Sequence, residues 1–285
     1  MPPRTVAIGA YPKMPDATEI AEAMAASLEQ RGVRPIRGSL NDSGLRRSVE
    51  AGEVDMLVAL GGDGTMLRAG HLAAPAQVPV LGVNLGRLGF LIEVERDEWP
   101  AAFDRVLAGD YWIERRMMLR ASLNRAGKEL TVWDVLNEVV VGRGKTVRLV
   151  RLETEIDGSF LTTYAADALI AATPTGSTAY ALAAGGPILP PELRNILIVA
   201  VAPHFSVDRA IVLHEGSTIR ITVRTDHQAT VSADGQSPMD IQDGDAVEVS
   251  AGEHSALFVR LQDPGYFYHN LTRRMSQNTN PGADR

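Results

Sequence analysis

The pentapeptide Gly61-Gly62-Asp63-Gly64-Thr65 directly follows a continuous apolar run at residues 54–60. Ligands of open α/β sheets sit beyond the carboxyl ends of the strands, where glycines let the backbone approach a phosphate closely. We expect a helix at 66–72 capped by Thr65, and the free N–H groups of its first turn favour an anion. An acidic side chain in such a loop indicates that Asp63 handles a proton or a metal ion. A plain strand-to-helix turn is the alternative, because Asp-Gly is common in turns.

Asn137 and Glu138 follow a strand-like run at 131–135 and precede an apolar run at 139–141. A carboxylate that accepts two hydrogen bonds suits a ribose diol, and an amide can read a purine edge. The pair is therefore a candidate for binding a nucleoside. The alternative is a pair of solvated strand residues.

The segment Thr173-Pro174-Thr175-Gly176-Ser177-Thr178-Ala179-Tyr180 follows an apolar strand expected at 168–172. It precedes a helix expected at 177–184. Its four hydroxyls, beside one glycine, offer small donors for phosphate or ribose oxygens, and Tyr180 adds an aromatic face. A helix start with more capping residues than it needs is the alternative.

Two common nucleotide-binding motifs are incomplete in this sequence. Gly144-Lys145-Thr146 resembles the end of a Walker A loop, but Val139 stands where the earlier glycine is required. Gly82, Gly86 and Gly89 do not have the G-x-G-x-x-G spacing of a dinucleotide fingerprint. A nucleotide, if bound, is bound without either device.

The elements that position these segments change in type along the chain. Apolar runs at 5–10, 54–60 and 78–83, separated by helical stretches such as 16–30, predict parallel strands covered on both faces. From about 118 to 259 the pattern indicates strands separated by turns. The sequence therefore predicts an α/β N-terminal domain with a parallel sheet and a β-rich C-terminal domain.

The predicted domain boundary lies at the start of a short helix expected at 98–107, after which the pattern changes to strands separated by turns. We predict an α/β domain at 1–98 and a β-rich domain at 99–263. A C-terminal segment at 264–276, with aromatic residues at 266–268, is expected to pack back on the first domain. The polar residues 277–285 predict a disordered tail.

Composition excludes several classes of protein. The 285-residue chain has no cysteine, which excludes disulfides, thiolate zinc, iron–sulfur clusters and a cysteine nucleophile. The net charge is −7, with no run of Lys or Arg longer than two, so no nucleic acid is expected as a partner. Apolar stretches such as 196–202 are too short to span a membrane, and the N-terminal run lacks the order of a signal peptide. The expected location is the cytoplasm.

The order of these motifs resembles that of the ATP-dependent NAD kinases, within the larger group that includes diacylglycerol and sphingosine kinases. The whole group shares GGDGT, whereas the order of GGDGT, Asn-Glu at 137–138, TPTGSTAY at 173–180 and AGGP at 184–187 is highly specific to NAD kinases. Asp-Gly-Gln at 234–236 also matches. The resemblance implies the same two domains, with the active site in the interdomain cleft and an assembly of two or four copies.

The resemblance also implies roles for individual residues. Asp63 would accept a proton from the adenosine ribose, and Gly61, Gly62 and Thr65 would face the phosphate donor. The residues that match positions lining the NAD site are Gly64, Arg68, Phe90, Asn137, Glu138, Arg148, Asp167, Thr178, Ala179, Tyr180, Ala183 and Gln236. Ala183 stands where many members have serine, and Ala165 replaces a polar residue that some members use.

The implied reaction transfers a phosphoryl group from ATP to the 2′-hydroxyl of the adenosine ribose of NAD, which gives NADP. Whether inorganic polyphosphate can replace ATP as the donor stays open from the sequence. Positioning and charge neutralisation matter more than the base in such a transfer, so Asp63 needs hydrogen-bond reach to the hydroxyl. Mg²⁺ or another divalent cation would be bridged by phosphates and waters, without a dedicated site made of protein ligands.

Two other functions stay open from the sequence. A lipid kinase of the same group would use GGDGT, but it should lack TPTGSTAY and should carry an exposed apolar or basic surface. A non-catalytic module that senses NAD would keep Asn137, Glu138 and Tyr180 and could discard Asp63.

Overall fold

The computed structural model describes residues 2–11, 16–86, 89–204, 209–268 and 271. The chain divides into two units. Unit 1 consists of residues 1–115 and 255–285, and unit 2 consists of residues 116–254.

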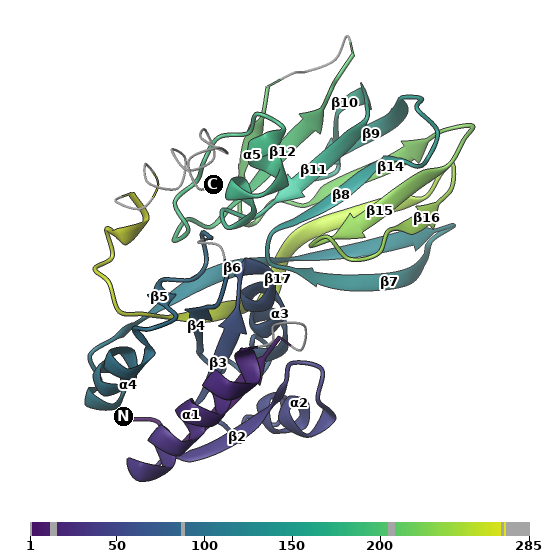
Figure 1. Ribbon diagram of the computed structural model, residues 1–285. Coiled ribbons are helices and arrows are strands. Elements are labelled where there is room, and N and C mark those ends of the chain that lie inside the picture. Colours follow the sequence, from purple (N-terminus) through teal and green to yellow (C-terminus); the bar gives the residue numbers. More distant parts are fainter. Residues whose placement is uncertain (1, 12–15, 87–88, 205–208, 269–270, 272–285) are drawn as a thin grey trace, which may run out of the picture. The chain divides into compact units, whose positions relative to one another are not determined.

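Unit 1 is built on a parallel sheet with helices between its strands. Its neighbouring strands, in spatial order, are β2 (Arg34–Ser39), β1 (Thr5–Ala10), β3 (Met56–Gly61), β4 (Val80–Asn84) and β5 (Val94–Glu95). Its helices are α1 (Ala17–Gln30), α2 (Ser43–Glu50), α3 (Asp63–Ala73) and α4 (Trp99–Ala108) (Figure 1). The chain order of the strands reverses between β1 and β3, and α/β sheets bind ligands at such a point.

The core of unit 1 explains its continuous apolar runs. Every residue of β3 and β4 is buried, as expected for parallel strands covered on both faces. Ile8 and Val58 belong to one hydrophobic cluster with Met24 of α1 and Phe103 of α4. These two helices therefore cover one face of the sheet.

Unit 2 consists of two antiparallel sheets. One has the strand order β13 (Ile211–His214), β12 (Asn195–Val201), β11 (Ala168–Ala172), β8 (Glu138–Arg143), β15 (Ala229–Ala233) and β16 (Met239–Ile241). The other contains β10 (Ser159–Ala166), β9 (Val150–Ile156), β14 (Ile219–Arg224), part of β17 (Ala246–Arg260), part of β6 (Trp112–Arg125) and β7 (Lys128–Val135). Figure 1 shows β12, β11, β8, β15 and β16 of the first sheet in this order.

Alternate residues of the two sheets form one core in unit 2. Val141 and Leu169 of the first sheet share a cluster with Leu152, Ile221 and Val247 of the second. The unit is therefore a β-sandwich, and the predicted fold class, an α/β domain with a parallel sheet and a β-rich domain, is confirmed.

The limits of the units differ from the predicted boundaries at 98 and 264. They fall inside β6 and β17, which are continuous strands over Trp112–Arg125 and Ala246–Arg260. A continuous strand has no break or change of composition that a sequence could mark.

The described part of the C-terminal segment belongs to unit 1. Tyr266 is buried, and its ring lies 6.5 Å from that of Trp112 between centroids. The predicted tail at 277–285 lies outside the described residues. None of the described helices is long and apolar enough to cross a membrane.

Candidate functional site

Asp63 is the first residue of α3, directly beyond the carboxyl end of β3. Gly62 is the N-cap, with extended backbone angles of φ −109° and ψ −170°. The predicted helix start at 66 with Thr65 as its cap is therefore wrong. Thr65 lies inside the first turn and is buried, and its N–H donates to the Gly62 carbonyl at 2.8 Å.

The glycines around Asp63 have different physical reasons. A Cβ on Gly61 would lie 2.2 Å from the Thr65 hydroxyl oxygen, so only glycine lets Thr65 pack beneath the loop. At Gly62 and Gly64, no described atom lies within 4 Å of an added Cβ. The backbone is thus open on the side of the loop where a phosphate could approach.

Two backbone N–H groups hold the Asp63 carboxylate. The Phe90 N–H donates to Oδ2 at 2.6 Å and the Leu91 N–H donates to Oδ1 at 3.0 Å. A Cβ on Gly89 would lie 2.1 Å from the carboxyl carbon of Asp63, so this contact requires glycine. In the sequence analysis, Gly89 was considered only as part of an incomplete dinucleotide-binding pattern, and its role beside Asp63 was missed. Phe90, a predicted site residue, thus meets Asp63 through its backbone.

Arg68 extends from the exposed side of α3. Its guanidinium carbon lies 5.2 Å from the centroid of the Tyr11 ring, within the range of a cation–π interaction. It lines a cavity of about 430 Å³ together with Arg46 and His71.

In unit 2, the Asp234 carboxylate fixes the backbone around Asn137. Its Oδ2 accepts from the Leu136 N–H at 2.7 Å, and its Oδ1 accepts from the N–H groups of Asn137 at 2.8 Å and Glu138 at 2.9 Å. Asp234 itself has a φ of 47°, in the left-handed region. The sequence pattern included Asp234 but assigned it no role.

The Glu138 carboxyl is buried, with the residue 8% exposed, and its Oε2 has no hydrogen-bond partner among the described residues. The pKa of Glu138 is raised to about 7, chiefly because burial disfavours the charged carboxylate. The negative charge of Asp234 contributes to this rise, and the hydrogen bond from the Tyr180 backbone N–H offsets part of it. Glu138 is therefore not a solvated strand residue; it is a buried acid with unused hydrogen-bonding capacity.

Most hydroxyls of the 173–180 segment donate to backbone carbonyls of the protein, which corrects the expectation that the four hydroxyls are available as donors to a ligand. The Thr173 hydroxyl donates to the Leu136 carbonyl at 2.6 Å, and the Ser177 hydroxyl donates to the Pro174 carbonyl at 2.6 Å. Thr175 is buried and accepts from Arg116 at 3.2 Å. A Cβ on Gly176 would lie 2.1 Å from the Asn137 carbonyl oxygen, so this glycine brings the two motifs together.

The helix expected at 177–184 is shorter and irregular. A 3-10 turn at Gly176–Thr178 precedes α5 (Tyr180–Ala183). Tyr180 is 43% exposed, which leaves its aromatic face accessible, and Thr178 donates to the Thr175 carbonyl at 3.0 Å.

The remaining predicted residues all belong to unit 2. Asp167 accepts from Arg143 Nε at 2.9 Å. The exposed members of the set are Arg148, Ala183 and Gln236. Ala179 and Ala165 are half-buried.

The structure therefore brings the predicted residues together in two groups. Unit 1 joins the glycine loop, Asp63 and Phe90, and unit 2 joins Asn137, Glu138 and the 173–180 segment. That both groups line one cleft stays a prediction. Among the described residues, no group of three or more His, Asp or Glu side chains could hold a metal ion.

The protein thus combines an α/β unit that has an acid in a glycine loop at a strand end with a β-sandwich that has a buried acid, Glu138, and an exposed tyrosine, Tyr180. Residues 13–111 match the model of the ATP-NAD kinase N-terminal domain, and residues 136–261 match that of the ATP-NAD kinase C-terminal domain. The chain belongs to the ATP-NAD kinase family.

Individual relatives agree with this membership. The NAD kinase of Chloroflexus aurantiacus is 39% identical over 93% of this chain and 96% of its own length. That of Heliobacterium modesticaldum is 40% identical over 96% of this chain and 99% of its own.

Two solved structures are similar over nearly the whole chain. A yeast NADH kinase complexed with NADH has a TM-score of 0.83 and 26% identity, covering 100% of this chain and 91% of that one. An NAD kinase from Archaeoglobus fulgidus in complex with ATP has a TM-score of 0.74 and 26% identity, covering 95% and 99%. The match to both kinase domains favours this family over the lipid kinases.

The raised pKa of Glu138 predicts a pH-dependent effect on stability. Its carboxyl binds a proton more tightly in the folded protein, so stability falls as the pH rises from about 4.5 to about 7 and stays lower above that. Glu138→Gln removes this cost, which corresponds to about 3 kcal/mol. We expect urea denaturation without ligand to show the variant more stable than the wild type by about this amount near pH 8.5. The difference should disappear near pH 4.5. An equal difference at both pH values would contradict the buried, ionising carboxyl.

Proposed function

We propose that this protein phosphorylates the 2′-hydroxyl of the adenosine ribose of NAD, with ATP as the donor, to form NADP. Asp63 accepts the proton of the attacking hydroxyl. Glu138, with Asn137 and the Tyr180 ring, binds the nucleotide. Family membership supports the reaction, and the geometry within each unit supports the roles of the residues.

The observation that carries the proposal is the fixed carboxylate of Asp63 beyond the carboxyl end of β3. A carboxylate has about four acceptor sites, and the N–H groups of Phe90 and Leu91 use one on each oxygen. The remaining sites can take the proton of a hydroxyl. Both bonds restrict rotation of the side chain, and a reacting group needs such restriction to act within hydrogen-bond reach.

The donor phosphate belongs beside the same loop. Gly62 and Gly64 leave the backbone open, and helix geometry leaves the N–H groups of Asp63 and Gly64, the first two residues of α3, without an acceptor inside the helix. A divalent cation would enter with ATP, and it would supply charge neutralisation at the transferred phosphoryl group.

The nucleoside part of NAD supplies the hydrogen-bond donor that the Glu138 carboxyl lacks. Its buried Oε2 has no hydrogen-bond donor among the described residues, and a ribose hydroxyl is a donor of suitable size. The exposed Tyr180 ring can stack on a base. The other residues that match positions lining the NAD site of the family keep the NAD-binding role that the resemblance implies.

We also propose that the protein is located in the cytoplasm and assembles from two or four copies. The absence of cysteine agrees with a cytoplasmic protein. The family resemblance supports a homodimer or homotetramer, which light scattering of the purified protein tests. A monomeric mass would contradict the proposed assembly.

Asp63→Asn tests the reaction and the base together. With NAD, ATP and Mg²⁺, the wild type should form NADP, and the variant should turn over about a hundredfold more slowly because its amide cannot accept the proton. The matched control is Asp55→Asn, since the Asp55 carboxylate also accepts two backbone N–H groups, from Arg4 at 2.7 Å and Thr5 at 2.8 Å. It should keep its turnover. Wild-type protein that binds NAD but forms no NADP would indicate a sensing module instead.

Glu138→Gln tests the nucleotide site by calorimetry of NAD binding. The amide has one acceptor oxygen in place of two, and the loss of a charge-assisted hydrogen bond should weaken binding about ten- to hundredfold. The wild-type affinity should rise about tenfold between pH 6 and 8 as the carboxyl ionises, whereas that of the variant should not. Glu153→Gln, in an ion pair with Arg224, is the control and should bind NAD normally. Unchanged affinity in Glu138→Gln would remove this residue from the site.

A further inference from the structure

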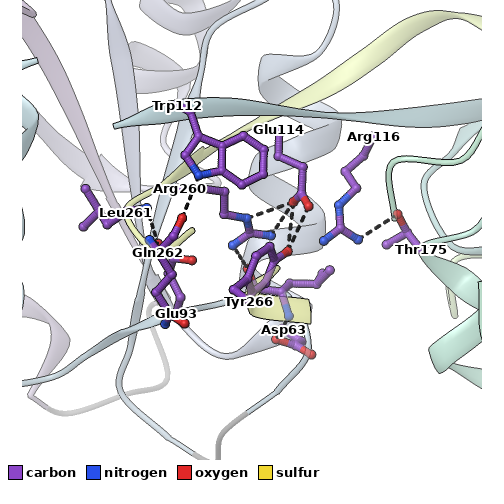
Figure 2. A network of polar contacts seen from close by, with 11 residues as sticks. Asp63, Glu93, Trp112, Glu114, Arg116, Thr175, Arg260, Leu261, Gln262 and Tyr266 are labelled. Carbon is purple, nitrogen blue, oxygen red and sulfur yellow. Dashed lines mark hydrogen bonds and ion pairs between the residues drawn. The ribbon is translucent and has the colours of Figure 1, made fainter. Parts of the chain in front are cut away.

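A buried ionic cluster lies in unit 1 and contains no predicted site residue. Arg260 at the end of β17 is 1% exposed, Glu114 of β6 is 3% exposed and Tyr266 is 2% exposed. Arg260 Nε donates to Glu114 Oε2 at 2.8 Å, and the Tyr266 hydroxyl donates to Glu114 Oε1 at 2.9 Å. Figure 2 shows the guanidinium and the tyrosine hydroxyl meeting at the same carboxylate.

Aromatic rings complete the enclosure of Arg260. Its guanidinium carbon lies 4.9 Å from the Tyr266 ring centroid and 5.4 Å from that of Phe258. Burial lowers the pKa of Arg260, but the electrostatic interactions with Tyr266, Glu114 and Glu93 outweigh this effect, so the pKa lies above its usual value. The side chain is a permanent cation held in one orientation.

This oriented cation reaches the loop that binds Asp63. Arg260 Nη1 donates to the Leu91 carbonyl at 2.8 Å, and the N–H of the same residue donates to Asp63 Oδ1 at 3.0 Å. Further hydrogen bonds connect this loop to the residues that follow β17. The Glu93 carboxylate accepts from the Leu261 N–H and, at 3.2 Å, from the Gln262 N–H. The position of the Asp63 carboxylate thus depends on a loop that Arg260 fixes.

Arginine suits this task better than lysine does. Its planar fork presents N–H groups in fixed directions, so one side chain binds the carboxylate and the carbonyl at once. Buried ion pairs give little net stability, because desolvation offsets their attraction. A cluster of this kind is better explained by the geometry it imposes than by the stability it adds.

We propose that Arg260, oriented by Glu114 and Tyr266, is a positioning residue that acts through the Leu91 peptide to hold the Asp63 carboxylate in its reactive orientation. The inference rests on the proposed role of Asp63 as the base. Arg260 has no chemical part in the transfer.

The test is the kinetics of Arg260→Lys in two backgrounds. In otherwise wild-type protein, kcat should fall about ten- to hundredfold, since small displacements of a reacting group have effects of this size. The KM values for NAD and ATP should stay within about threefold, because only the transition-state geometry is affected. In the Asp63→Asn background the same change should lower kcat no further, because residues acting as one unit are not additive.

The matched control is Arg125→Lys. Arg125 forms a two-bond ion pair with Asp245, which is 2% exposed, in unit 2. This variant should lose thermal stability and keep kcat. If Arg260→Lys does not fold, Glu114→Gln takes its place in both backgrounds, since it frees the Arg260 fork while an amide oxygen remains to satisfy part of it.

The outcomes separate this inference from the proposed function. A folded Arg260 variant with unchanged kcat, or one that loses the same factor in both backgrounds, overturns the positioning role while the Asp63 base stands. Full turnover in Asp63→Asn alone overturns the base and, with it, any action of Arg260 through it. If the substitution lowers kcat in otherwise wild-type protein and not in the Asp63→Asn background, the result supports the inference.

Discussion

The hydrogen bonds from the Phe90 and Leu91 N–H groups to the Asp63 carboxylate are the interaction on which the rest of the unit 1 site depends. Bonds to an ionised acceptor are roughly twice as strong as neutral ones, so they select one orientation of the side chain. They require α3 to start at Asp63, which the extended Gly62 makes possible. They also require a glycine at 89, because a Cβ there would overlap the carboxyl group. One contact therefore explains several separate features of the sequence.

Unit 2 uses the same physical device for a different purpose. The Asp234 carboxylate accepts three N–H groups from the segment that contains Asn137 and Glu138. It thereby shapes the backbone, while the Glu138 side chain is left buried and only partly satisfied. In unit 1 the carboxylate that accepts the hydrogen bonds, Asp63, is itself the proposed reacting group. In unit 2 the backbone that donates them carries the functional acid, Glu138, and the negative charge of Asp234 raises the pKa of Glu138.

The fold class and the motifs were predictable because they depend on local patterns. Apolar runs such as 54–60 mark covered strands, and the glycine loop, the Asn-Glu pair and the 173–180 segment identify the family. The roles of Gly89 and Arg260 were not predictable, because they arise from contacts between segments far apart in the chain. The hydroxyls of Thr173 and Ser177 were misinterpreted because their acceptors are backbone carbonyls whose positions only the folded loop defines.

The two acids of the proposed site differ in how completely the protein satisfies them, and this difference bears on specificity. Asp63 receives donors from the protein, so its geometry is set before any ligand arrives. Glu138 has a buried oxygen without a donor among the described residues, which is costly for the free protein above pH 7. A ligand that donates a hydroxyl removes this cost, whereas an analogue without the hydroxyl leaves the carboxylate buried and unpaired. Sites of this kind reject the deficient analogue far more strongly than an apolar pocket rejects a missing methylene group. An acid that destabilises the free protein is thus suited to select a nucleoside with an intact ribose.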